Sequence, residues 1–369
     1  MTGSRKSPVS ITDGRRDFLW KSLAAGALLP VYLKAQCAAF RTGLAALSLQ
    51  TPAVKPPSKE PITSNADFFV RNHFGIPKID AEVWNLTVEG MASTPLKLSY
   101  SDLLLMTSVR RSLTFECAGN VSGGIGVGNA VWSGLSLADL LKQSGIRSGV
   151  TTIVLHGADS GEGEGLLANT HFARAIPFEK AMEPLTLLAY EMNGSPLPAD
   201  HGFPLRALVP GWYGMDSVKW LTRIELTSQP FEGYFQQKQY VALTGEARRP
   251  VTRMLVSSKF LRPSEDEEIH SKTYRFEGVA WAGEGKVAKV EVRIGPGTVW
   301  QAADLNAVPA EMIWTPWSYD WRVPGPGHYT LEVRATDDEG HTQPEARDSK
   351  RQDAYELNTP HRITVTARA

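Results

Sequence analysis

The chain has 369 residues, which is too long for one ordinary compact domain and predicts two domains of typical size. Lys plus Arg and Asp plus Glu both number 39, so the formal net charge is zero. No global field therefore attracts nucleic acid or an acidic membrane surface, and any recognition of an anion must be local.

Residues 1–50 are predicted to be a leader for twin-arginine export. The pair Arg15-Arg16 precedes a short, mildly apolar stretch, which is the pattern of that pathway. The stretch is shorter than the roughly 20 residues of a membrane-spanning helix, so we expect no permanent membrane span. An amphipathic N-terminal helix is the alternative. Residues 51–65, rich in proline, are predicted to be an extended linker, and the expected location is the periplasm or another exported compartment.

Residues 66–248 are predicted to form a mixed α and β domain. Strand-like runs occur at 84–88 and 152–155. Between them, Ser101 and Ser136 each precede an apolar helical run, where an N-cap residue is expected.

Residues 249–369 have a different pattern, in which short alternating strands are separated by turns. The runs 286–292 and 328–333 are examples, and helical runs are few. This pattern predicts an all-β, immunoglobulin-like sandwich.

The sequence has two cysteines, Cys37 and Cys117, and Cys37 lies in the predicted leader. The remaining thiol cannot form an internal disulfide, so Cys117 is either an inert buried residue or a residue with a ligand. It follows a strand-like run and precedes Ala118 and Gly119, small residues that let a bulky ligand approach the backbone. A thiolate at this place suits a soft metal.

Three further segments of the first domain concentrate polar side chains. Residues 71–73 are Arg-Asn-His, whose donors suit an anionic ligand, although a solvated loop is the alternative. Asp159 lies in what resembles a strand end that turns on glycines, or an ordinary Asp-led turn. His201, Arg206 and Lys219 stand beside glycine turns and are residue types that hold a phosphate. No phosphate-loop or dinucleotide motif offers another explanation.

In this order, F-V-R-N-H (69–73), E-C-A-G-N (116–120), D-H-G-F-P-L-R (200–206) and S-V-K-W (217–220) resemble the molybdenum domain of sulfite oxidases and plant nitrate reductases. The resemblance extends from about residue 60 to the C-terminus. It implies a mixed α/β molybdopterin domain followed by an all-β immunoglobulin-like domain that mediates homodimerisation, with no haem domain in this chain.

The resemblance also implies roles for individual residues. Cys117 would supply a thiolate to molybdenum, beside the two dithiolene sulfurs of one molybdopterin. The positions that would bind the molybdopterin and its phosphate are Phe69, Val70, Arg71, Asn72, His73, Asp159, His201, Arg206, Ser217, Val218 and Lys219. Those implied for the substrate pocket are Arg71, Trp132, Tyr240 and Arg362.

The implied reaction is the oxidation of sulfite to sulfate, with water as the oxygen source. Arginine and a phenol can hold the oxygens of this small dianion during the reaction. Two electrons then pass to an external acceptor, such as a c-type cytochrome.

One departure from the family pattern bears on the substrate. Animal sulfite oxidases follow C-A-G-N with two arginines, whereas Val121 and Ser122 stand here, so a cation of the expected pocket is missing. The glycine-rich stretch 123–128 that follows is consistent with a loop of different path, in which another residue substitutes.

Alternative functions remain open at this stage. With the same cofactor, the chain would be a sulfane dehydrogenase, a sulfoxide reductase, or an oxidase that uses oxygen directly. In a thiol hydrolase, Cys117 would be a nucleophile activated by a residue such as His201. A non-catalytic exported binding protein would use the immunoglobulin-like domain for recognition.

Overall fold

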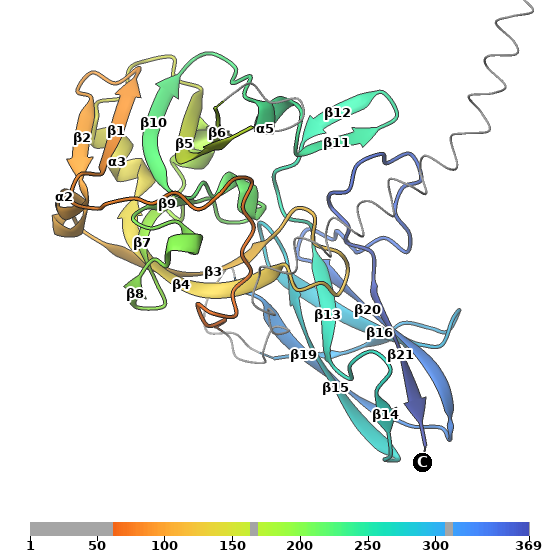
Figure 1. Cartoon of the computed structure of the whole chain (residues 1–369). Helices are drawn as coiled ribbons and strands as arrows, with labels where there is room; N and C mark the ends of the chain where they lie inside the picture. The colour runs from red at the N-terminus through yellow and green to blue at the C-terminus, as the bar shows by residue number, and fades with distance from the viewer. Residues whose placement is uncertain (1–61, 163–168, 307–312, 369) are drawn as a thin grey trace, which may run out of the picture. The chain divides into compact units, whose positions relative to one another are not determined.

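The computed structural model describes residues 62–162, 169–306 and 313–368, all within one unit of the chain, Val54–Ala369 (Figure 1). The predicted leader lies outside the described residues, as does the linker up to residue 61. None of the helices in the described part has both the length and the apolar character that a membrane crossing requires.

The first sheet has five strands in the order β2-β1-β10-β5-β6. Strand β1 runs parallel to β10, and the other neighbours are antiparallel. In β1, Leu86 and Val88 are wholly buried and alternate with partly exposed residues, as in a strand with one buried face. The strands are β1 (Asn85–Gly90), β2 (Leu96–Ser99), β5 (Thr152–Gly161), β6 (Thr170–Pro177) and β10 (Leu221–Thr227).

The two strands predicted in this domain are therefore present, as parts of β1 and β5. The expected strand end at residues 156–161 was wrong, because β5 continues to Gly161. The register of its pairing with β6 shifts between His156 and Ser160, and this irregularity lies beside Asp159.

The second sheet also has five strands, in the order β3-β4-β7-β8, with β9 paired to β7. Strand β3 ends at Glu116, so Cys117 begins the loop that leads to β4. The strands are β3 (Val109–Glu116), β4 (Val127–Ser136), β7 (Leu187–Met192), β8 (Ser195–Pro196) and β9 (Arg206–Leu208). A separate hairpin pairs β11 (Val241–Thr244) with β12 (Ala247–Pro250).

Helices in this domain are short. Ser136 accepts a hydrogen bond from the Asp139 N–H and caps α3 (Leu137–Gln143), as predicted. The other cap was wrong: Ser99, not Ser101, caps α2 (Tyr100–Leu105) in a capping box with Asp102. The remaining helices are α4 (Phe178–Ala181), α5 (Tyr234–Gln237), η1 (Ala199–His201) and η2 (Gly214–Asp216).

Residues 257–367 form a β-sandwich, which confirms the predicted fold class of the second domain. One sheet has the order β13-β15-β19-β18 and the other β14-β21-β20-β16-β17. Apolar side chains from both sheets, including Phe276, Trp317, Val292 and Val333, form one core. The strands are β13 (Ser257–Arg262), β14 (Glu268–Ile269), β15 (Thr273–Trp281), β16 (Val287–Ile294), β17 (Gln301–Ala302), β18 (Asp304–Leu305), β19 (Thr315–Arg322), β20 (Gly327–Asp337) and β21 (His361–Ala367).

Candidate functional site

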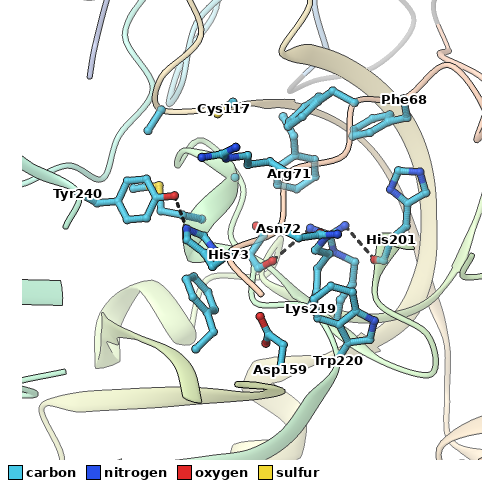
Figure 2. Close-up of a pocket in the computed structure, with 18 residues that line it drawn as sticks. Phe68, Arg71, Asn72, His73, Cys117, Asp159, His201, Lys219, Trp220 and Tyr240 are labelled. Atoms are coloured by element: carbon cyan, nitrogen blue, oxygen red, sulfur yellow. Dashed lines mark hydrogen bonds between the residues drawn. The ribbon is translucent and has the colours of Figure 1, made fainter. Parts of the chain in front are cut away.

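A cavity in the first domain brings together segments that lie far apart in the sequence (Figure 2). The irregular segment before β1, the loop after β3, and the region between η1 and β10 each contribute to its wall. The lining includes Phe69, Arg71, Asn72, His73, Cys117, Asp159, His201, Arg206, Ser217, Lys219 and Tyr240, all named in the sequence analysis. It also includes Phe68, Phe115, Ala118, Phe172, Gly214, Met215 and Trp220.

Cys117 lies at one end of this cavity. Its backbone N–H donates to the Gly126 carbonyl at 2.8 Å, which closes the base of the loop. Burial raises the pKa of the Cys117 thiol, and the nearby Arg71 opposes this to a smaller extent. A buried thiol of this kind becomes a thiolate when it coordinates a metal ion.

Arg71 and Tyr240 lie at the same end (Figure 2). Arg71 is exposed to the cavity, and none of the described residues forms a hydrogen bond or ion pair with its guanidinium. The Tyr240 hydroxyl shares a hydrogen bond of 2.5 Å with His73 Nε2. Burial lowers the pKa of His73 to about 3, so this imidazole is neutral at physiological pH.

The opposite end of the cavity carries Arg206, which is buried, and Lys219, which is partly buried, and their hydrogen-bond partners among the described residues are neutral oxygens. Arg206 donates to the carbonyls of His201 and Ser217, each at 3.1 Å, while its Nε has no partner among the described residues. Lys219 donates to the Asp200 carbonyl at 2.8 Å and to the Asn72 side chain. Burial lowers the pKa of Arg206 to about 9 and that of Lys219 to about 7.

Two further groups complete this polar end. Burial raises the pKa of Asp159 to about 6, and Asp159 Oδ1 has no partner among the described residues. Burial also lowers the pKa of His201 to about 4, so His201 is neutral here. His201 therefore adds no charge at this end, Asp159 and Lys219 attract one another, and the Arg206 guanidinium remains charged at physiological pH.

These observations decide which kind of ligand fits the cavity. A buried arginine such as Arg206, which has no carboxylate hydrogen-bond partner and an unsatisfied Nε–H among the described residues, is unfavourable unless an anion neutralises it. A phosphate beside Arg206 and Lys219 would do so. A soft metal would suit Cys117 at the other end. A metal-bearing organic cofactor with a phosphate therefore fits the residues present.

The structure does not bring every predicted residue to the cavity. Trp132 is wholly buried in β4, where its ring centroid lies 5.0 Å from the Arg206 guanidinium and supports it from behind. Arg362 lies on β21, where it donates to Glu332 at 2.6 Å and is 65% exposed. Val70 and Val218 are not among the lining residues either.

One residue that lines the cavity, Phe172, and two that lie behind its wall, Arg174 and Tyr355, were not predicted. Phe172 lies on β6 and stacks on His73, with ring centroids 4.4 Å apart. Arg174, two residues further on the same face, forms a fully buried ion pair with Asp216 at 2.7 Å. The sequence signal that could have identified Arg174 is an arginine at an inward-facing position of a strand. Tyr355 packs against Tyr240 with ring centroids 5.1 Å apart, and nothing local in the sequence indicated this.

Val121 and Ser122 supply no cation to the cavity. Val121 is 56% exposed. The Ser122 hydroxyl lies 2.6 Å from the Thr359 carbonyl, to which it can donate.

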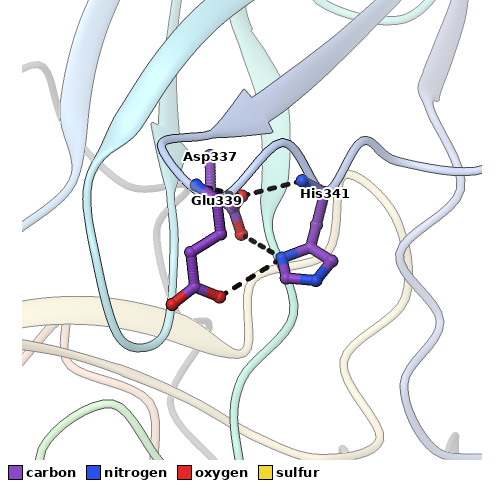
Figure 3. Close-up of side chains that lie close together, drawn as sticks. All are labelled: Asp337, Glu339 and His341. Atoms are coloured by element: carbon purple, nitrogen blue, oxygen red, sulfur yellow. Dashed lines mark hydrogen bonds and ion pairs between the residues drawn. The ribbon is translucent and has the colours of Figure 1, made fainter.

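A second group of metal-ligand types lies in the sandwich domain, where Asp337, Glu339 and His341 approach within 4.8 Å (Figure 3). Asp337 accepts from the backbone N–H groups of Glu339 and His341 and pairs with the His341 ring at 3.1 Å. Glu339 pairs with Arg253 at 2.8 Å. These contacts explain why the three residues lie together, because they close the turn after β20.

Comparison with known families assigns both halves of the chain. Residues 73–235 match the oxidoreductase molybdopterin binding domain. Residues 248–367 match the Mo-co oxidoreductase dimerisation domain.

Several proteins are similar over much of the chain. Mitochondrial sulfite oxidase of Homo sapiens is 30% identical over 318 residues, which cover 77% of this chain and 57% of that protein. An NADH nitrate reductase of Brassica napus is 30% identical over 325 residues, covering 75% of this chain and 35% of that protein. The chain therefore spans little more than half the length of the sulfite oxidase and about a third of the nitrate reductase.

A solved structure is also similar. The sulfane dehydrogenase SoxCD from Paracoccus pantotrophus matches with a TM-score of 0.74 and 25% identity, covering 83% of this chain and 81% of that one.

Proposed function

The chain belongs to the sulfite oxidase family of molybdopterin-dependent oxidoreductases, and on that premise we propose that it oxidises sulfite to sulfate. In the balanced reaction, sulfite and water give sulfate, two protons and two electrons. We propose that the electrons leave to an external acceptor such as a c-type cytochrome.

The observation that carries the proposal is the Arg71 guanidinium at the Cys117 end of the cavity, for which the described residues provide no hydrogen-bond or ion-pair partner. A small oxyanion would satisfy its unpaired N–H groups through charge-assisted hydrogen bonds. The Tyr240 hydroxyl, fixed by His73 at 2.5 Å, stands at the same end and offers a second polar contact. Arg71 and Tyr240 would thus hold an oxyanion while its sulfur faces the metal side.

The chain's own residues also fit the cofactor of this family. Cys117 would bind molybdenum, and Arg206 and Lys219 would hold the phosphate of molybdopterin, for the reasons of charge and burial given above. When bound, the molybdenum cofactor supplies two-electron redox chemistry and oxygen transfer. Phe172, stacked on His73 at 4.4 Å, covers the imidazole on one side and helps exclude water.

A second candidate substrate is a sulfane sulfur compound. Val121 and Ser122 leave Arg71 without a neighbouring cation on the Cys117 loop, so the pocket is less suited to a dianion than a pocket with several arginines. The similarity to a sulfane dehydrogenase structure supports the same alternative.

Two further proposals concern location and assembly. The Arg15-Arg16 pattern supports twin-arginine export to the periplasm. The match to a dimerisation domain supports a homodimer formed through the sandwich domain.

The test is metal analysis of protein made in a molybdopterin-producing host, followed by sulfite-dependent reduction of ferricyanide or cytochrome c. We expect stoichiometric molybdenum and turnover, and no turnover from a folded Cys117→Ser variant. Arg71→Ala should raise the KM for sulfite by about ten- to a hundredfold, because it removes a charge-assisted hydrogen bond. Arg275→Ala, which removes a surface pair with Asp320, is the control. Molybdenum without sulfite turnover would transfer the proposal to the sulfane substrate.

A further inference from the structure

The loop that carries Cys117, residues 117–126, has an internally bonded base. The Cys117 carbonyl accepts from the Asn120 N–H at 2.8 Å, and the Asn120 side chain accepts from the Gly126 N–H at 3.0 Å. These bonds fix the shape of the loop. They do not fix where the loop stands relative to the rest of the cavity.

Lys259 of the sandwich domain reaches this loop from β13. Its Nζ donates to the Gly124 carbonyl at 2.6 Å, and the residue is only 2% exposed. Burial lowers the pKa of Lys259 to about 8, and attraction from Glu116 opposes this effect. A buried ammonium whose hydrogen bond among the described residues goes to a neutral carbonyl is a poor source of stability. The position of Lys259 is better explained by its contact with the Cys117 loop at the Gly124 carbonyl.

The segment that leads into β21, residues 357–361, contacts the same loop. The Ser122 hydroxyl lies 2.6 Å from the Thr359 carbonyl and 3.0 Å from the Leu357 carbonyl. Gly123 has a φ of 75°, and a Cβ there would fall 2.1 Å from the His361 ring. The loop and this segment therefore approach as closely as a glycine allows.

The residue just before Cys117 is held by the sandwich domain as well. Trp281 Nε1 donates to Glu116 Oε2 at 2.9 Å, and the Asn120 side chain donates to Glu116 Oε1 at 3.0 Å. Contacts from the sandwich domain thus reach the chain immediately before Cys117 and at Ser122 and Gly124 after it.

We propose that the sandwich domain sets the position of the Cys117 sulfur, with Lys259 and Ser122 as positioning residues. The inference rests on the proposed function only in that Cys117 is the metal ligand. It gives the second domain a part in the site in addition to any part in dimerisation.

The test uses the full-length holoenzyme with two pairs of variants. Lys259→Met removes the ammonium at nearly constant length, and Lys289→Met is its control, because Lys289 is 52% exposed and pairs with Glu291 on the same domain. Ser122→Ala removes the hydroxyl, and Ser271→Ala is its control, because the Ser271 hydroxyl also donates to a carbonyl, that of Thr273. Lys259→Arg should restore wild-type behaviour in part.

Two readouts report the position of the loop. Amide hydrogen exchange in residues 117–126 should become about tenfold faster in Lys259→Met and, to a smaller extent, in Ser122→Ala. The thiolate-to-metal absorption band should shift in the same variants, whereas the controls should change neither readout. A residue with only a structural role would lower the Tm and leave the band of the loaded protein in place.

Wild-type exchange and an unshifted band in both Lys259→Met and Ser122→Ala would overturn the inference. If Lys259→Met does not fold, the Ser122 pair decides. If the wild-type protein holds no molybdenum, the proposed function fails, but hydrogen exchange still decides whether the sandwich domain positions the loop.

Discussion

Replacing Arg206 by methionine should have opposite effects on the cofactor-free protein and on the loaded protein. Burial lowers the pKa of Arg206 from 12.5 to about 9, which corresponds to roughly 5 kcal/mol of unfavourable free energy for the charged side chain. Arg206→Met removes this cost. It leaves the carbonyls of His201 and Ser217 without a donor, at about 1 kcal/mol each. The net gain of about 3 kcal/mol should raise the Tm of the cofactor-free protein by about 6 to 12 °C.

In the loaded protein the same change removes a cation that would hold the phosphate. Truncating one member of a buried charge pair costs about 2 to 5 kcal/mol, so cofactor affinity should fall by about 30- to 4,000-fold. Differential scanning fluorimetry on protein from a host that lacks molybdopterin measures the first effect. Molybdenum and pterin analysis of protein from a competent host measures the second. Arg223→Met, which removes a half-exposed pair with Glu89, is the control.

The reasoning is refuted if Arg206→Met lowers the Tm of the cofactor-free protein while full pterin content is retained. That result would mean that Arg206 is already neutralised within the fold and has no anion to hold.

Two further predictions concern pH and packing. Burial lowers the pKa of Lys219 from 10.5 to about 7, so between these values the unfolded chain binds more protons than the cofactor-free fold, and stability rises with pH. Melting curves across this window should show a smaller rise for Lys219→Met than for the wild type; equal slopes would contradict the assignment. Gly134→Ala places a Cβ 2.0 Å from the Leu188 carbonyl oxygen and should lower the free energy of unfolding by about 2 to 3 kcal/mol in urea titrations. The control is Gly75→Ala, which meets nothing within 4 Å; similar losses from both variants would exclude the steric explanation.

Local sequence patterns predicted most of the strands because burial on one face leaves an alternation that can be read directly, as in β1. These patterns gave the wrong prediction where the same residues were consistent with two local structures. Ser99 and Ser101 both precede the apolar run of α2, and only Ser99 has Asp102 placed to complete a capping box. At residues 156–161, glycine and aspartate suggested a turn, but pairing with β6 keeps the chain extended through a register shift.

The site was predictable to the extent that its residues lie in compact motifs. Arg71, His73, Cys117 and Lys219 were all placed beforehand, and the structure brings them to one cavity. Residues that depend on contacts between distant segments were not predictable. Tyr355 meets Tyr240 across more than a hundred residues of sequence, and no local pattern encodes such a contact. In the same way, no local sequence pattern indicated that the Arg362 side chain forms an ion pair with Glu332.

The hydrogen bond between Trp281 and Glu116 has a consequence for how the protein can be divided. The first family match ends at residue 235 and the second begins at residue 248, so the segment between them is an obvious boundary for expressing the domains separately. A fragment that stops there would lose the indole that partners a wholly internal carboxylate, and burial already raises the pKa of Glu116 to about 7. The two domains match separate family models. A chimaera that exchanges one of them would nevertheless need to retain the partners of Glu116.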